Sequence, residues 1–467
     1  METTNMNSRL STVTLDLDRI NDFRKSQTSL LSATSDDASG QIHERLLMRQ
    51  NTCHVNDINN YYYSKKMPLE GSYAIWNNRG GSGKTNLTYH LAIKYAYRHP
   101  DKTVLVVDMC PQADLSHAFL GDDEEGHDYV SQIGSLKKNP MILDGQQFIP
   151  RTISGYLDLY TSVGLPNNVD PRTFLFNVSK FNNQLPRNVY LLCGDTSLEL
   201  LGKAMDLKRS SNTITPYTNA WRTITQSLRV FIHKIGERRG IKLMTFIDTN
   251  SSFNISTEIA LTAADKIILP VSEDHLHRNG FEYLFSLLYG FSQPSSIYSY
   301  YRHYSFYYRA DENGVKLPKI HLILCTASSI NKETKLGINN NSLPKPEEIN
   351  NCWHFVYDIY TKHRDAFEIH SNQKLSPRLS SSSTSSNDQH FTSSFNNHTN
   401  NLIQIETFEE FMSQYVMHIN NESNIVSRIA VKSHSPLLAV KHPHHSHEYQ
   451  STAQTFDKTL NDIVERI

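Results

Sequence analysis

Residues 76–85, Trp-Asn-Asn-Arg-Gly-Gly-Ser-Gly-Lys-Thr, constrain the fold of this chain more than any other stretch. They follow a short apolar run at residues 72–76 that is typical of a buried strand, and they precede residues 86–97, which are typical of a helix. Three glycines let the backbone curl without Cβ clashes, so that consecutive N–H groups can point into one hollow. Because this hollow opens at a helix N-terminus, which favours anions, the stretch predicts a site for nucleotide phosphates.

Individual residues of this stretch have predicted parts in phosphate and metal binding. Lys84 is expected to reach the outer phosphates, and the hydroxyl of Thr85 is expected to contact Mg²⁺. The backbone of the loop and the start of the helix complete the cradle. The predicted nucleotide-binding residues are Gly80, Gly81, Ser82, Gly83, Lys84, Thr85 and Asn86.

The loop departs from the common pattern G-x-x-x-x-G-K-[ST], because Asn78 stands where the first glycine belongs. Residues 79–85 resemble instead the loop K-G-G-x-G-K-T of the ParA/MinD branch of P-loop ATPases. The resemblance implies an α/β fold with a doubly wound, mainly parallel sheet flanked by helices. It also implies ATP and Mg²⁺ as cofactors and an ATP-dependent sandwich homodimer. Arg79, at the position of the family's lysine, is then expected to reach the phosphates of the other subunit.

The second motif of that family, D-x-D-P-Q-x-N-x-[ST], has a counterpart directly after the apolar run at residues 103–107. The matching residues are Asp108, Pro111, Gln112 and Ser116. A carboxylate at the carboxyl end of a strand beside a phosphate loop is well placed to hold Mg²⁺ or its waters.

The family's second Asp orients the attacking water, but this position is Cys110 here, and a thiol cannot replace that carboxylate. Nucleotide binding is therefore predicted, with slow or absent hydrolysis. The predicted catalytic residues are Lys84, Arg79, Asp108 and Cys110.

The third motif is an apolar strand, residues 242–248, that ends in Asp248 at the Walker B position. The predicted Mg²⁺ ligands are therefore Thr85, Asp108 and Asp248. Residues 249–252 replace the family's T-P-P, which we expect to loosen that loop. Residues 259–271 match the family's A-L-x-A-A-D-x-V-I-I-P-V, and a further strand is predicted at 319–326.

The C-terminal part of the sequence also resembles that of family members. Residues 425–438 resemble the segment in which relatives place basic residues that touch DNA, here Arg428 and Lys432. Residues 456–467 are typical of an amphipathic final helix with one apolar face.

Composition and motif spacing divide the chain into two parts. Residues 1–68 are polar and are expected to be a mostly disordered arm, with a small partner-binding or DNA-reading unit as the alternative. Residues 69–467 are expected to form a ParA-like P-loop ATPase domain with insertions. The insertions are predicted at about 121–187, 285–318 and 331–415, and residues 377–401 within the last are low-complexity.

Within the second insertion, residues 297–309 interleave tyrosines with arginine and histidine. We expect an ordinary helix and loop that bury these rings. The alternative is a surface that stacks bases or contacts a partner.

Composition excludes several classes of protein. Lys and Arg number 46 against 47 Asp and Glu, so net charge does not point to nucleic acid. Five cysteines without C-x-x-C spacing suit a reducing compartment and exclude a sequence-local zinc or iron–sulfur motif. No apolar run approaches the roughly 18 residues of a membrane span, and the N-terminus does not resemble a signal peptide. We therefore expect a cytoplasmic protein, associated with the nucleoid if the source is bacterial.

Three functions fit these features. The first is a ParA-like ATPase that acts in plasmid or chromosome partitioning or in cargo positioning, with possible non-specific DNA binding and a protein partner that stimulates hydrolysis. The second is a degenerate ATP-binding switch that recruits partners and hardly turns over. The third is a DNA-binding regulator that acts through residues 1–68.

Overall fold

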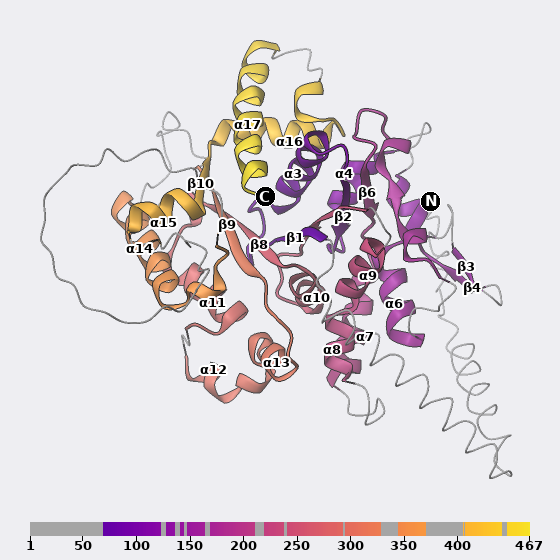
Figure 1. Cartoon of the computed structure of the whole chain (residues 1–467), viewed down its shortest axis with the longest axis horizontal. Helices are drawn as coiled ribbons and strands as arrows, with labels where there is room; N and C mark the ends of the chain where they lie inside the picture. Colours follow the sequence, from indigo (N-terminus) through magenta and orange to yellow (C-terminus); the bar gives the residue numbers. More distant parts are fainter. Residues whose placement is uncertain are drawn as a thin grey trace, which may run out of the picture. The chain divides into compact units, whose positions relative to one another are not determined.

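A largely parallel sheet carries the predicted phosphate loop at the end of one of its central strands (Figure 1). Among the described residues, eight strands form this sheet in the order β10-β9-β8-β1-β7-β2-β6-β5. All neighbours are parallel except β5 and β6, which are antiparallel. The strands are β1 Leu69–Ile75, β2 Thr103–Asp108, β5 Phe176–Asn177, β6 Val189–Leu192, β7 Leu243–Asp248, β8 Lys266–Ser272, β9 Lys319–Thr326 and β10 Val416–Ile419. The predicted fold class is confirmed.

The computed structural model describes most of the chain after residue 68. It covers residues 69–122, 128–135, 141–143, 147–163, 169–210, 219–237, 241–292, 295–327, 344–369, 405, 407–440 and 446–467. All of them belong to one compact unit, Lys66–Ile467. The predicted arm at residues 1–68 and the low-complexity stretch at 377–401 lie outside the described residues.

The central strands are buried on both faces, which explains their nearly continuous apolar sequences. Every residue of β7 is buried, as are all residues of β2 except Thr103. Because side chains alternate along a strand, Leu105 and Val107 enter the apolar cluster on one face, whereas Val104 and Val106 enter the cluster on the other. The sheet therefore separates two hydrophobic cores.

Helices cover both faces of the sheet (Figure 1). One core is closed by helices near the two ends of the described chain, α3 Lys84–Arg98, α4 Asp114–Leu120, α5 Tyr129–Gly134, α16 Asn421–Lys432 and α17 Ser446–Arg466. The other is closed by α6 Ile153–Val163, α7 Ser197–Ser210, α8 Ala220–Thr225, α9 Ser227–Gly236, α10 Ile255–Ala263, α11 Arg278–Tyr289, α13 Phe306–Glu312, α14 Pro346–Lys362 and α15 Phe408–Tyr415. The predicted apolar face of the last helix is confirmed, because Phe456, Leu460, Ile463 and Val464 are all buried. No helix among the described residues is long and apolar enough to span a membrane.

The predicted insertions contain ordered elements of their own. The first holds α5, α6 and a two-stranded antiparallel ribbon, β3 Met141–Leu143 with β4 Gln147–Ile149. The second holds α12 Ser296–Tyr300 and α13, and the third holds α14 and α15.

The expectation that residues 297–309 bury their rings is wrong for three tyrosines. Tyr300 and Tyr304 are 82% and 83% exposed, and Tyr301 is 62% exposed. The physical reason is the shortness of the elements that carry them. Helix α12 has five residues and buries none of them, and only α13, which packs against α11, turns Phe306 inward.

Phe246 lies fully buried in the middle of β7, beside the rings of Tyr73 and Tyr95. We expect Phe246→Ala to lower the free energy of unfolding by about 3–5 kcal/mol, because it removes apolar contacts and leaves a cavity. Urea denaturation followed by circular dichroism measures this loss. Tyr304→Ala removes an exposed ring and is the matched control, expected to change stability by less than about 0.5 kcal/mol. Equal losses in the two variants would contradict the described core.

Candidate functional site

The glycine-rich loop joins the end of β1 to the start of α3 and has a shape that only glycine adopts readily. Gly81 and Gly83 have φ angles of 74° and 83°, in the left-handed region that disfavours residues with a Cβ. Gly83 is also the N-cap of α3, so the free N–H groups of the first helical turn face the loop. Asn77 anchors the loop, because its amide donates to the carbonyl of Pro270 at 2.7 Å and accepts from the Arg79 N–H at 3.0 Å.

Lys84 and Arg79 differ in their exposure. Lys84 is buried, and its ammonium group donates to the carbonyl of Arg79 at 2.9 Å, so it lies across the inside of the loop. Burial lowers the pKa of Lys84, whereas the nearby Asp248 raises it. Arg79, Gly80 and Gly81 are exposed on the rim. The loop therefore places one cation inside the phosphate hollow and a second on its outer edge.

Two predicted Mg²⁺ ligands are in direct contact. The hydroxyl of Thr85 donates to Asp248 at 2.8 Å, and that of Thr88 lies 3.4 Å from the other oxygen of the same carboxylate. Asp248 ends β7 and is the register partner of Asp108, which ends β2. Both carboxylates are fully buried. The parallel register thus brings Thr85, Asp108 and Asp248 to the same edge of the sheet.

Asp108 is held in place by backbone and side-chain donors. One oxygen accepts the Cys110 N–H at 3.0 Å, and the other accepts both the N–H and the hydroxyl of Ser116, at 2.9 and 2.7 Å. The Ser116 hydroxyl in turn accepts the Gly194 N–H at 2.9 Å. A Cβ at Gly194 would lie 2.9 Å from Asp108 Cγ and 2.8 Å from the Cys110 carbonyl oxygen, so this glycine is required by close approach. Gly194 lies in none of the motifs described above, so the sequence did not predict this contact.

The electrostatics of the site favour a bound cation. Burial raises the pKa of Asp108 to about 6 and that of Asp248 to about 8, and the charge of Asp108 adds to the rise at Asp248. Lys84 lowers the pKa of Asp248. A divalent cation would offset the cost of two buried carboxylates and hold both in the charged form.

Cys110 carries a neutral thiol at neutral pH. Burial and the neighbouring Asp108 raise its pKa to about 12. Its contribution to the site is the backbone N–H that Asp108 accepts. The side chain therefore supplies neither the negative charge nor the strong acceptor that a carboxylate would place there.

A cavity of about 560 Å³ opens beside the loop and can accommodate a small organic ligand. Its walls come from the loop, the ends of β8 and β9, the start of α11 and one side of α16. Predicted residues in the wall include Arg79, Gly80, Asn86 and Arg428. Arg428 and Lys432 lie one turn apart on α16, and both are exposed. Sequence reasoning missed Asn424, which lines the same cavity and had no motif around it.

Hydrogen bonds fix the loop after Asp248, contrary to the expectation that the loss of the family's prolines loosens it. The Thr249 hydroxyl donates to the carbonyl of Ile75 at 2.7 Å, which ties this loop to the end of β1. The Thr257 hydroxyl donates to the Ser252 carbonyl at 2.6 Å, and Asn254 caps α10. These bonds replace the rigidity of the missing prolines.

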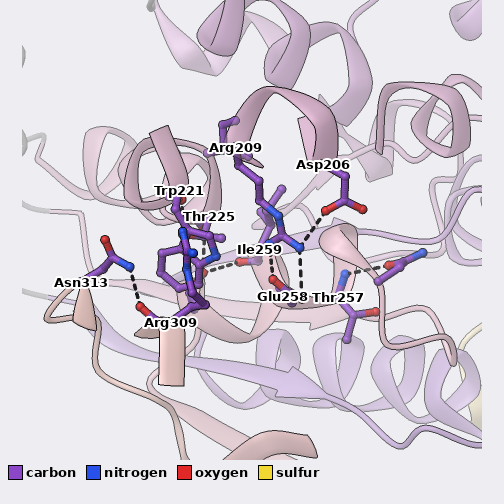
Figure 2. A network of polar contacts seen from close by, with 12 residues as sticks. Asp206, Arg209, Trp221, Thr225, Thr257, Glu258, Ile259, Arg309 and Asn313 are labelled. Carbon is purple, nitrogen blue, oxygen red and sulfur yellow. Dashed lines mark hydrogen bonds and ion pairs between the residues drawn. The ribbon is translucent and has the colours of Figure 1, made fainter. Parts of the chain in front are cut away.

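A partly buried polar network holds the start of α10 in place (Figure 2). Arg209 of α7 forms ion pairs with Glu258, which directly follows Thr257, and with Asp206 at 2.7 Å. Burial raises the pKa of Glu258, and Arg209 opposes that effect. On the next turn of α10, the Thr262 hydroxyl donates to the Thr225 carbonyl at 2.6 Å. The network therefore connects α7 and α8 to the loop that follows Asp248.

The loop, the lysine and the buried carboxylate together define the class of nucleotide-binding site. A glycine-rich loop at the end of a central parallel strand, a lysine at the start of the next helix and a buried carboxylate on an adjacent strand form a P-loop nucleotide-binding site. The family model "CobQ/CobB/MinD/ParA nucleotide binding domain" matches residues 73–440. The chain belongs to that family.

Several solved structures are similar to this chain at low identity. The McdA(D38A)–ATP complex from Cyanothece is 12% identical over 82% of this chain and 95% of its own, with a TM-score of 0.41. MinD with Mg-ADP from Pyrococcus horikoshii OT3 is 12% identical over 84% and 95%, with a TM-score of 0.38. Cobyrinic acid a,c-diamide synthase from Mycobacterium smegmatis with an ATP analogue and magnesium is 18% identical over 62% and 83%, with a TM-score of 0.35. A search of curated protein sequences finds no match.

The raised pKa of Asp248 gives a testable dependence of stability on pH. The unfolded carboxyl ionises near its ordinary pKa, whereas the folded one retains its proton to higher pH, so this group lowers stability as pH rises towards its folded pKa. Without nucleotide and metal, we expect Asp248→Asn to be more stable than wild type at pH 8 by more than about 1 kcal/mol, because the wild-type carboxyl must ionise in a buried site. At pH 4 the two proteins should match.

Urea denaturation at both pH values measures the difference. Asp457→Asn is the matched control, because Asp457 forms an ion pair with Lys94 at 2.7 Å near the surface, so that neutralising it should not raise stability at pH 8. A less stable Asp248→Asn at pH 8 would contradict the described electrostatics.

Proposed function

We propose that this protein is a ParA-like ATP-binding protein that binds ATP with Mg²⁺ at residues 79–86 and turns it over slowly. The observation that carries this proposal is the Thr85–Asp248 contact at the mouth of the glycine loop. The loop N–H groups and Lys84 would hold the phosphates. Thr85, Asp248 and Asp108 would hold the metal, directly or through its waters.

The residues present fit a magnesium ion. Mg²⁺ prefers oxygen ligands, and this edge of the sheet offers one hydroxyl and two buried carboxylates. When bound, the ion neutralises charge on the phosphate oxygens. The protein's own contribution is to hold these oxygens in place, through Ser116 and the backbone for Asp108 and through Thr85 and Thr88 for Asp248.

A second candidate, an ATP-dependent switch that recruits partners with hardly any turnover, is favoured by Cys110. A residue that orients an attacking water must accept its hydrogen bond strongly, and the neutral thiol does so weakly. In such a switch, the presence of bound ATP, and not its hydrolysis, controls whether partners are recruited.

The dimer and the partners are part of the same proposal. Arg79 is exposed on the rim of the loop, where a second copy of the chain can bring its own phosphates. A guanidinium offers a wider set of donors than the ammonium of the family's lysine. Arg428 and Lys432 offer two adjacent positive charges for non-specific contact with DNA, a contribution that depends strongly on salt. We propose a cytoplasmic role in DNA partitioning or cargo positioning, with a protein partner that stimulates hydrolysis.

We expect Cys110→Asp to raise the steady-state ATPase rate by about 100-fold, because it restores a carboxylate that can orient water. Cys110→Ser keeps a small neutral side chain and is the matched control, expected to stay slow. Lys84→Ala should lose ATP binding, measured by equilibrium titration with a fluorescent ATP analogue. A Cys110→Asp rate equal to wild type would refute the role assigned to this position. A wild-type rate equal to that of ordinary family members would refute slow turnover.

We expect Arg79→Ala to lose ATP-dependent dimerisation while each subunit still binds ATP. The loop contact to Lys84 uses the Arg79 backbone carbonyl, which the substitution keeps. Sedimentation velocity with and without Mg·ATP measures the dimer, and Arg79→Lys, which restores the family's residue, should dimerise. An Arg79→Ala protein that dimerises like wild type would show that this side chain does not act across the interface.

A further inference from the structure

Three potential metal ligands meet at the ends of neighbouring strands, outside the residues assigned to nucleotide binding. Cys325 lies in β9 and is the register partner of His418 in β10 on one side and of Val271 in β8 on the other. Glu273 follows β8 in a short 3-10 turn. Paired residues on neighbouring strands point to the same face of a sheet. The topology thus gathers a carboxylate, a thiol and an imidazole from three segments far apart in the sequence.

The spacing of these groups suits a small tetrahedral ion. The three ligand atoms lie within 4.8 Å of one another. Glu273 Oε1 and His418 Nδ1 are 3.7 Å apart, longer than a hydrogen bond. Around a tetrahedral zinc ion, with bonds of about 2.0–2.3 Å, ligand atoms are separated by roughly 3.3–3.7 Å. The carboxylate–imidazole pair already has this separation, and the Cys325 thiol needs to move closer to the other two groups by no more than about 1 Å.

The surroundings allow an ion to enter and to be retained. Cys325 is fully buried, whereas the side chains of Glu273 and His418 are 30% and 58% exposed. One side of the group is therefore open to solvent, where water can fill a fourth position. Without metal, burial and the charge of Glu273 raise the pKa of Cys325 to about 12, so the sulfur holds its proton.

The group lies beside the cavity, at the same end of the sheet. Val271, the register partner of Cys325, belongs to the same apolar core as Cys325 and lines the cavity, as do Leu324 and Ile419 from the other core. The neighbours of the three ligands, Ser272, Thr326 and Ile419, all line that cavity. An ion would therefore join β8, β9 and β10 next to the nucleotide cavity.

We propose that Glu273, Cys325 and His418 form a binding site for Zn²⁺. The ligand set selects this ion, because Mg²⁺ and Ca²⁺ prefer oxygen alone, whereas zinc accepts sulfur, nitrogen and oxygen in tetrahedral geometry. Binding forms the Zn–S bond and releases the thiol proton of Cys325 to solvent, while His418 binds in its neutral form. The ion would fix the ends of three strands and reduce their motion.

Cobalt(II) tests this site in the full-length protein, because it replaces zinc in tetrahedral sites and gives an intense charge-transfer absorption only when a thiolate is bound. The metal-free protein is titrated with Co²⁺ alone, without nucleotide, so the outcome does not depend on the proposed ATP site. We expect the absorption in wild type and its displacement by Zn²⁺. Cys325→Ser should abolish it, and His418→Ala and Glu273→Gln should weaken Co²⁺ binding by more than about tenfold.

Two controls keep the test specific. Cys352→Ser removes another buried thiol and should leave the absorption unchanged. The histidines among residues 442–447 can bind Co²⁺, but without sulfur they give no thiolate absorption. His418→Ala is at an exposed position and reports on the site even where Cys325→Ser fails to fold. Absence of the absorption in wild type, or its persistence in Cys325→Ser, would overturn the proposal.

Discussion

The charges of two buried carboxylates on adjacent parallel strands determine which groups the rest of the site must supply. Asp108 and Asp248 end β2 and β7 in register, and their mutual repulsion has to be offset by groups from other elements. Thr85 and Thr88 from α3 stabilise one carboxylate, and the N-terminal half of α4 stabilises the other through Ser116. The start of α3 contacts Asp248 through Thr85, and the turn at Gly194 approaches Asp108 closely. In the proposed function, a bound cation balances the charge of the two carboxylates.

The sequence allowed the central sheet to be predicted closely, because strands buried on both faces leave an unmistakable apolar pattern. The run at 319–326 is a strand of that length, and residues 103–107 and 242–248 lie within one residue of β2 and β7. Residues 220–236, in contrast, form two helices, α8 and α9, with Gln226 between them. Its side chain contacts the Thr262 carbonyl at 3.4 Å, a tertiary contact that local periodicity does not encode.

The candidate site was predicted to the extent that its residues lie in motifs. Lys84, Thr85, Asp108 and Asp248 are all at the edge of the sheet where the motifs placed them. Gly194 was missed because its role depends on the proximity of Cys110 and Asp108, more than 80 residues earlier. The Glu273–Cys325–His418 group was missed for the same reason, since only the order of strands β8, β9 and β10 brings those residues together.

The contact between Cys110 and Asp108 has a consequence for how such a protein changes over evolutionary time. Asp108 accepts the backbone N–H of residue 110, and every amino acid except proline provides that donor. The side chain at this position can therefore vary without disturbing the carboxylate beneath it. Within the proposed function, the side chain at position 110 sets the rate of ATP hydrolysis, and a single substitution can change that rate. The lifetime of the bound state can be lengthened or shortened while the affinity for nucleotide stays the same.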